Sequence, residues 1–214
     1  MYRSAEVRWF LQDDLPGAVI EWFETGGRVR NEPERTDEYL VLPGCATASV
    51  KFRGGRFEVK AQTEPPVPVH FPNACSGLRD AWVKWSSDRI DVDNLRDQVA
   101  RPEDEWISVS KSRRLRLISL EAGEPVEVAP DHGWLSGGCQ VELTVVRAWM
   151  RPDEQSRALP WWSLSFEAFG NEEAMRDGLD QVVREFVEDA PVTLAREASF
   201  SYPAWLQRFN KERG

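Results

Sequence analysis

The stretch ASVKFRGGRFEVKAQ, residues 48–62, alternates polar and apolar side chains on both sides of a pair of glycines. Alternation with a period of two is typical of a β-strand that has one apolar face. Gly54 and Gly55 form a two-residue loop suited to a primed hairpin turn, in which both central residues have φ above zero. We therefore expect strands over residues 48–53 and 56–62, joined as an antiparallel hairpin.

The two faces of this hairpin differ in chemistry. Ser49, Lys51 and Arg53 share one face of the first strand, and Glu58 and Lys60 share one face of the second. The opposite faces carry Val, Phe and Ala side chains. The hairpin thus predicts a sheet with one charged face and one apolar face.

The same alternation recurs along much of the chain. It predicts further strands at residues 3–12, 34–42, 106–120, 139–149 and 161–169. Residues 77–86 are ambiguous. Four prolines in residues 63–72 predict a loop, and residues 123–138 are rich in turn-forming residues.

Four segments have the features of helices. Residues 171–189 are the clearest, because Asn171 is a suitable cap and apolar residues follow it at helical spacing. Residues 15–25 predict a short helix that begins near Pro16 and ends before two glycines. Residues 93–100 and 200–209 predict two more short helices.

The length and composition favour one folded domain over residues 1–214. The chain is 41% hydrophobic and 11% aromatic, with ten Trp, which is enough for a sizeable core. Its net charge of −9 disfavours a nucleic-acid surface and an anionic membrane as partners. There is no run of apolar residues long enough for a membrane span and no signal-peptide pattern at the N-terminus.

Cysteine and histidine usage narrows the chemistry further. Cys45, Cys75 and Cys139 are odd in number and widely spaced, which favours buried thiols in a reducing cytoplasm. The two histidines, His70 and His132, are too few for a His-based metal site or a Ser-His-Asp triad. We expect a cytoplasmic protein without a zinc site.

The strands together suggest a closed sheet. At least six of them place charged residues at alternate positions, while their other faces carry Trp, Phe and aliphatic side chains. A sheet that closes on itself beneath outer helices would bury the apolar face under the helices and turn the charged face inward. The alternative is a barrel of another kind, for small molecules, whose charged residues merely face solvent.

A charged interior would need a charged ligand, because buried ions without partners are costly. The candidate bases would bind phosphate oxygens, and the candidate carboxylates would hold a divalent cation. The bases are Arg8, Lys51, Arg53, Lys60, Arg114 and Arg116, and the carboxylates are Glu6, Glu142 and Glu167. We expect a small anionic ligand that carries phosphates.

The order of these motifs resembles the CYTH, or triphosphate tunnel metalloenzyme, superfamily over nearly the full chain. The matching elements are Glu6-x-Arg8, Lys51-x-Arg53, Lys60, an Arg-rich strand, and a late strand with Glu167. The resemblance implies an α+β, mainly β, fold: an eight-stranded antiparallel β-barrel, or triphosphate tunnel, with helices packed outside. It also implies a triphosphate, nucleotide or polyphosphate ligand and Mg²⁺ or Mn²⁺ as cofactor.

The chain departs from the family pattern in its carboxylates. Ser4 and Ser165 stand where Glu-x-Glu motifs of the family carry a first Glu. The resemblance therefore implies one metal site, at Glu6, Glu142 and Glu167, more readily than two. Its later basic element corresponds to Arg114 and Arg116, which the alternation favours, or to Lys111 and Arg113.

Three functions remain open from the sequence. The first is metal-dependent hydrolysis of a triphosphate, with Glu6 and Glu167 as catalytic residues. The second is a catalytically reduced module that binds a nucleotide or polyphosphate as a sensor or accessory protein. The third is an adenylyl cyclase, an activity that also occurs in the family.

Overall fold

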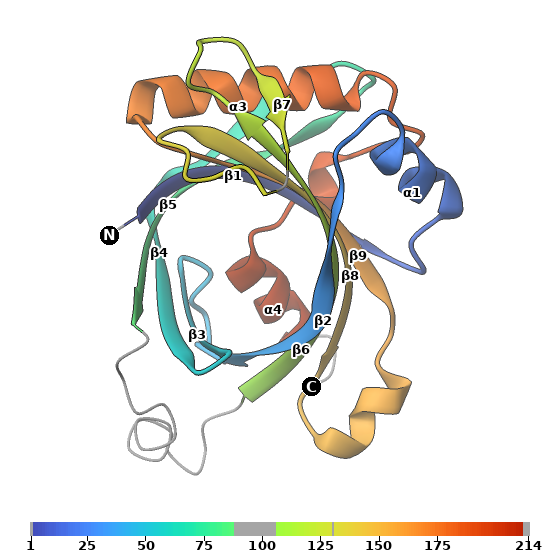
Figure 1. The fold of residues 1–214 in the computed structure, drawn as a ribbon. Coiled ribbons are helices and arrows are strands. Elements are labelled where there is room, and N and C mark those ends of the chain that lie inside the picture. Colours follow the sequence, from blue (N-terminus) through green and yellow to red (C-terminus); the bar gives the residue numbers. More distant parts are fainter. Residues whose placement is uncertain (1, 88–105, 130, 212–214) are drawn as a thin grey trace.

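The computed structural model describes residues 2–87, 106–129 and 131–211, and its main feature is a closed antiparallel sheet (Figure 1). The strand order is β2-β3-β4-β5-β1-β9-β8-β6-β7, and β2 also pairs with β6. Because β2 pairs with β6, the eight strands that run from β2 to β6 in this order close into a barrel. The ninth strand, β7, pairs with the end of β6. The predicted mainly β barrel with helices is thereby confirmed.

The elements agree with most of the predicted ranges. The part of the chain that is described has nine strands: β1 (Tyr2–Gln12), β2 (Arg30–Leu40), β3 (Ala48–Arg53), β4 (Arg56–His70), β5 (Ser76–Ser87), β6 (Trp106–Ser119), β7 (Val126–Val128), β8 (Gly138–Trp149) and β9 (Trp161–Phe169). The helices are α1 (Gly17–Glu24), α3 (Glu172–Val187) and α4 (Tyr202–Lys211), with short 3₁₀ turns η1 (Pro152–Arg157) and η2 (Arg196–Ala198). The ambiguous residues 77–86 belong to a strand, whereas the helix predicted at 93–100 lies outside the described residues.

The quoted hairpin forms as predicted. Strands β3 and β4 pair in a register that sets Arg53 opposite Arg56, so that only Gly54 and Gly55 connect them. The two glycines have φ of 53° and 75°. Residues with a Cβ rarely adopt this left-handed conformation, which explains why glycine occupies both positions.

The loop predicted for residues 63–72 is wrong over most of its length, because β4 continues to His70. Its pairing with β5 shifts register between Gln62 and Glu64 and again between Glu64 and Val67. Proline cannot donate to a ladder, and a bulge leaves residues unpaired. The irregularities therefore accommodate Pro65 and Pro66 within a continuous strand.

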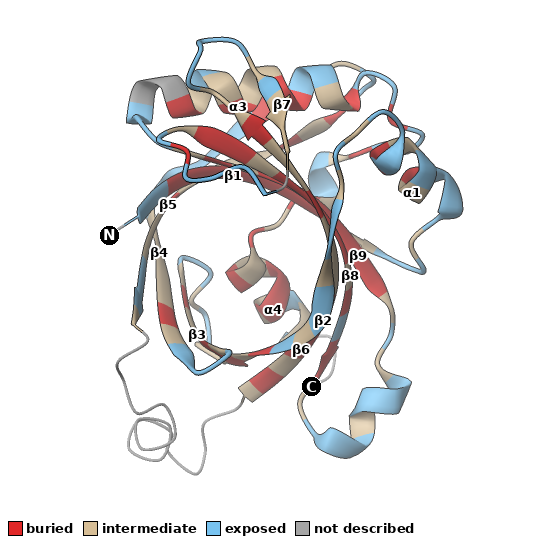
Figure 2. Cartoon of the chain, in the orientation of Figure 1, coloured by how far each residue is buried: buried red, intermediate tan, exposed pale blue. Residues whose placement is uncertain are grey.

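The main apolar core lies outside the barrel wall, beneath α3 and α1. Alternate residues of β1, β8 and β9 point outward into it, among them Val7, Trp9 and Phe166. Helix α3 covers them with Leu179 and Val183, which are fully buried. Figures 1 and 2 show this helix lying across the barrel above a band of buried strand residues.

A second apolar cluster lies inside the barrel. Helix α4, visible through the ring of strands in Figure 1, packs Trp205 against the interior side chain Phe10 with ring centroids 4.7 Å apart. Tyr202 of the same helix stacks on Tyr39 of β2 at 5.7 Å. The inward face of β1 thus runs from charged Glu6 and Arg8 to an apolar floor formed with α4.

Two further predictions concern the cysteines and the membrane. All three cysteines are free thiols; Cys75 and Cys139 are buried as predicted, whereas Cys45 is only partly buried. Burial raises the pKa of Cys75 to about 12, which keeps this thiol protonated. None of the helices within the described residues is long and apolar enough to cross a membrane.

Candidate functional site

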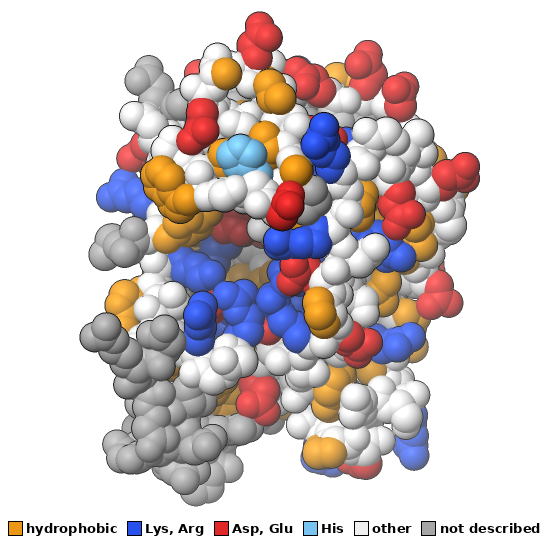
Figure 3. Space-filling view, viewed as in Figure 1, with side chains coloured by type: hydrophobic (Ala, Val, Ile, Leu, Met, Phe, Trp, Pro, Cys, Tyr) orange, Lys and Arg blue, Asp and Glu red, His pale blue; other side chains and the backbone are white. Residues whose placement is uncertain are grey.

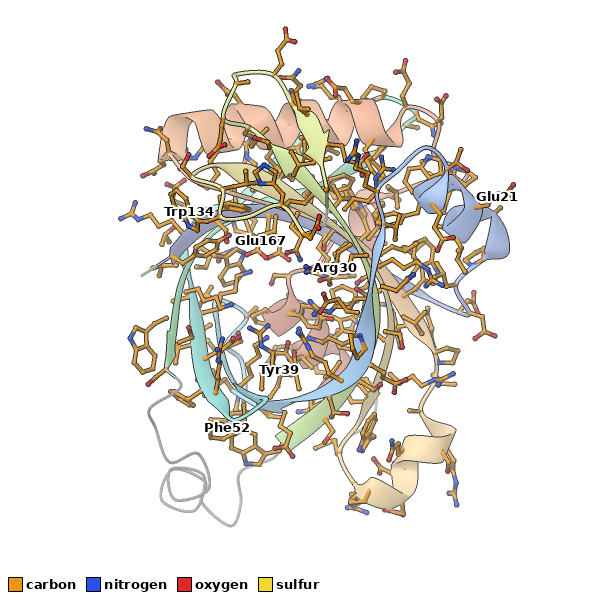
Figure 4. All side chains as sticks on the ribbon, viewed as in Figure 1. Glu21, Arg30, Tyr39, Phe52, Trp134 and Glu167 are labelled. Carbon is orange, nitrogen blue, oxygen red and sulfur yellow. The ribbon has the colours of Figure 1, made fainter. Side chains whose placement is uncertain are left out.

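The barrel encloses a cavity of about 620 Å³ above the α4 floor. Eight Lys or Arg side chains and four Glu side chains line it. The bases are Arg8, Arg35, Lys51, Arg53, Lys60, Lys84, Lys111 and Arg113, and the carboxylates are Glu6, Glu58, Glu142 and Glu167. Figure 3 shows the Lys and Arg side chains gathered around the hollow, and Figure 4 shows Glu167 and Tyr39 within the ring of strands.

Seven of the nine predicted site residues share this cavity. They are Glu6, Arg8, Lys51, Arg53, Lys60, Glu142 and Glu167. They come from β1, β3, β4, β8 and β9, which are far apart in sequence. Because inward positions alternate along every strand, closing the sheet brings them together.

The structure does not bring the preferred positions for the later basic element, Arg114 and Arg116, into the cavity. Arg114 Nε donates to Glu24 of α1 at 2.9 Å, and Arg116 donates to Glu127 of β7 at 2.6 and 2.8 Å. The alternative positions, Lys111 and Arg113, do line it. Strand β6 carries cations on both faces, so alternation alone could not identify the inward one.

Two basic lining residues were not singled out from the sequence, namely Arg35 and Lys84. A register irregularity between Glu32 and Arg35 precedes Arg35 and obscures its face. Lys84 lies in the ambiguous segment, among Trp and Val residues that conceal the strand period. The sequence contains only a weak indication that these bases face inward. Each lies two residues from another inward-facing side chain, which is polar or aromatic.

The deepest ion pairs connect β1, β8 and β6. Arg8 Nε donates to Glu6 Oε1 at 2.7 Å, and its NH1 group lies 3.4 Å from Glu142 Oε1. Arg113 donates to Glu142 Oε2 at 3.2 Å. Lys60 donates to Glu6 Oε2. Glu6, Arg8 and Glu142 are all buried, so these pairs offset a large desolvation cost.

A second cluster surrounds Asp37 of β2, which is fully buried. Lys111 donates to Asp37 Oδ2 at 2.8 Å and to the Tyr39 hydroxyl at 2.7 Å. Lys51 and Arg35 lie 3.3 and 3.2 Å from the same carboxylate. One carboxylate therefore serves three cations.

A third cluster has the same excess of cations. Glu58 of β4 is buried and pairs with Arg53, with Lys51 at 3.2 Å and with Lys84 at 3.6 Å. Lys51 is shared between Glu58 and Asp37. The internal acids therefore do not neutralise all of the bases around this part of the cavity.

The pKa values express this imbalance. Burial alone would raise the pKa of Glu6, but Lys60 and Arg8 outweigh it and lower that pKa to about 2. Burial likewise opposes the effect of Arg8 and Arg113 on Glu142, whose pKa also falls to about 2. Burial lowers the pKa of Lys111 to about 7, and Lys51 adds to this shift by repulsion. Glu6 and Glu142 are therefore ionised at neutral pH, whereas Lys111 loses its proton more readily than an exposed lysine would.

The predicted metal ligands do not fit a divalent cation in this arrangement. All four oxygens of Glu6 and Glu142 accept hydrogen bonds or ion pairs from Arg8, Lys60, Arg113 and Thr144. Glu167 accepts from Ser4 at 2.8 Å and lies 3.5 Å from Lys60. Among the described residues there is no group of three or more metal-binding side chains. Binding of Mg²⁺ or Mn²⁺ at Glu6, Glu142 and Glu167 stays a prediction.

Comparison with known proteins shows similarity to solved structures but to no known family. No protein-family model matches the chain, and no curated protein matches it significantly. Among solved structures, a conserved hypothetical protein from Pyrococcus furiosus aligns with 94% of this chain and 98% of its own. The TM-score is 0.44 and the sequence identity is 10%. The functional proposal therefore depends on the cavity itself.

Proposed function

We propose that the barrel binds a small polyanion, of the triphosphate or polyphosphate class, in its central cavity. One observation carries this proposal: in a chain whose net charge is −9, eight cations line the cavity against its four Glu and the buried Asp37 that pairs with three of them. Charged side chains that merely faced solvent would be mainly acidic, as in the protein as a whole, whereas the charged side chains that line the cavity are mainly basic. The ordered resemblance to the CYTH superfamily supports the same class of ligand.

The physical reason is the cost of buried positive charge. Lys51, Arg53 and Lys84 share Glu58, and Lys51, Arg35 and Lys111 share Asp37. A ligand with several anionic oxygens would supply the missing partners through charge-assisted hydrogen bonds. It would also match the spread of these bases over several strands, which one monovalent anion would not.

Binding is favoured over metal-dependent hydrolysis because Glu6 and Glu142 already have cationic partners. For hydrolysis these carboxylates would have to exchange Arg8, Arg113 and Lys60 for a metal ion. We therefore propose a binding protein, such as a sensor or accessory protein, as the function that this geometry supports best. Hydrolysis and cyclisation are the alternative functions, and activity assays test them.

Isothermal titration calorimetry with tripolyphosphate, in the presence of EDTA, tests the proposal directly. The matched variants are Arg113→Met and Arg114→Met, which remove the same charge from adjacent positions on opposite faces of β6. We expect Arg113→Met to weaken binding by about ten-fold or more, and Arg114→Met to leave it unchanged. Absence of binding to the unmodified protein, or equal losses in both variants, would overturn the proposal.

Activity assays separate the remaining functions. Phosphate release from tripolyphosphate, ATP and thiamine triphosphate is measured with Mg²⁺ and with Mn²⁺, and cyclic AMP formation is measured from ATP. A binding protein gives no product in either assay while still binding tripolyphosphate. Phosphate release abolished by Glu167→Gln would instead establish the hydrolase, and cyclic AMP would establish the cyclase.

A further inference from the structure

A second pocket that adjoins the charged cavity, the rim, carries unusually exposed aromatic side chains. Trp134 exposes 86% of its surface, more than any other large hydrophobic residue among those described, and Tyr2 exposes 41%. Both line this second pocket of about 430 Å³, together with Leu135 and Phe169. Figure 4 shows Trp134 beside the barrel opening, above the N-terminal end of β1. An exposed Trp in a pocket wall is typical of a binding surface.

Tyr2 belongs to both hollows. It lines the charged cavity as well as the second pocket, so the two share this side chain as a wall. Its ring lies 5.8 Å from that of Phe169, which extends the aromatic surface away from the charges. Figure 3 shows hydrophobic side chains adjoining the Lys and Arg side chains at this edge of the hollow.

The strand register places this aromatic surface directly beside two bases. Tyr2 of β1 is opposite Lys84 of β5, and Lys84 is opposite Lys60 of β4. Neighbouring strands lie about 5 Å apart, so the three side chains form one row across the barrel wall. A ligand whose phosphates contact Lys60 and Lys84 would have its next group at Tyr2.

We propose that this rim binds the planar aromatic group of an organic polyphosphate, such as the base of a nucleoside triphosphate. This inference rests on the proposed function, because the charged cavity would hold the phosphates of the same molecule. Stacking on Tyr2 and Trp134 would favour such a ligand over inorganic tripolyphosphate. Stacking discriminates poorly between bases, so the rim would accept adenine and guanine alike.

Calorimetry with tripolyphosphate, ATP and GTP, again in EDTA, tests this inference. We expect ATP and GTP to bind between about five- and a hundred-fold more tightly than tripolyphosphate, and within about three-fold of each other. Trp134→Ala should remove most of this advantage while leaving tripolyphosphate binding within two-fold, roughly the resolution of such a comparison. Leu159→Ala, at an exposed position that lines neither hollow, is the matched control.

The outcomes distinguish the two proposals. If tripolyphosphate does not bind, the proposed function fails. If tripolyphosphate binds but ATP has no advantage, or if its advantage survives Trp134→Ala, only the aromatic subsite is wrong. Sedimentation velocity on the same variants examines the other occupant, a second copy of the chain. Self-association that Trp134→Ala abolishes would reassign the rim to an interface between copies and overturn the inference.

Discussion

Arg8 and Glu6 lie two positions apart on β1, and the Arg8 guanidinium turns back along the strand to donate to Glu6 Oε1 at 2.7 Å. Both residues are buried on the inward face of the barrel. Arg8 also donates to the Ser163 hydroxyl at 3.2 Å and stands over the Tyr202 ring at 4.8 Å. It therefore connects the charged layer of the cavity to the α4 floor.

Replacing Arg8 by Met should destabilise the protein by about 3–5 kcal/mol, because Glu6 and Glu142 would each lose a buried cationic partner. Chemical denaturation measures the free energy of unfolding. The control is Arg114→Met, whose pair with Glu24 is partly exposed and should contribute about 1 kcal/mol or less. Similar losses in the two variants would contradict a structural role for the buried pair.

Replacing Glu58 by Gln should strengthen tripolyphosphate binding by about ten-fold, because it frees bases for phosphate oxygens. Lys51, Arg53 and Lys84 all share this carboxylate in the free protein. Calorimetry compares Glu58→Gln with Glu24→Gln, which removes a carboxylate of the outer surface. If Glu58→Gln weakened binding, the carboxylate would be part of the ligand site and not a competitor of the ligand.

Much of the barrel could be predicted from the sequence because its strands have one charged face and one apolar face. Residues 48–62, with two glycines between alternating segments, define their hairpin without any long-range information. The extent of β4 could not be predicted in the same way. Pro65 and Pro66 normally interrupt a strand, and only the two register shifts against β5 explain how they are tolerated.

The candidate site was predicted where one strand face carries charges and the other does not. Lys51, Arg53 and Lys60 are such positions. On β6 the signal fails, since Arg113 and Arg114 are adjacent bases of opposite orientation and both have acidic partners. The pairing of β6 with β2 and β8 determines which of its faces points inward. This pairing joins residues far apart in sequence, so the local alternation pattern cannot predict it.

Trp205 should be among the most important residues of the fold for stability, because it joins α4 to the barrel interior. Its side chain is fully buried and stacks on Phe10. Trp205→Ala should therefore lower the free energy of unfolding by about 3–5 kcal/mol. Trp134→Ala, at the exposed rim, should change it by about 0.5 kcal/mol or less. Equal effects would show that α4 does not pack in the barrel as described.

Asp80 of β5 provides a prediction about pH. It is buried beside β1 and accepts a hydrogen bond from Gln62 Nε2 at 2.5 Å. Burial, and then repulsion by Glu6, raise the pKa of Asp80 to about 7. Asp80 is therefore protonated in the folded protein over a pH range in which it is ionised in the unfolded chain.

Proton linkage determines whether Asp80 raises or lowers the stability as the pH rises. Between the unfolded pKa of about 4 and the folded pKa of about 7, the folded state binds more protons, so this group lowers stability as pH rises. Asp80→Asn preserves the acceptor for Gln62 but does not titrate. Relative to the unmodified protein, the variant should gain about 3 kcal/mol between pH 5 and pH 8, measured by denaturation at each pH. Parallel stability curves for the two proteins would show that Asp80 is ionised throughout and that its interior position carries no such penalty.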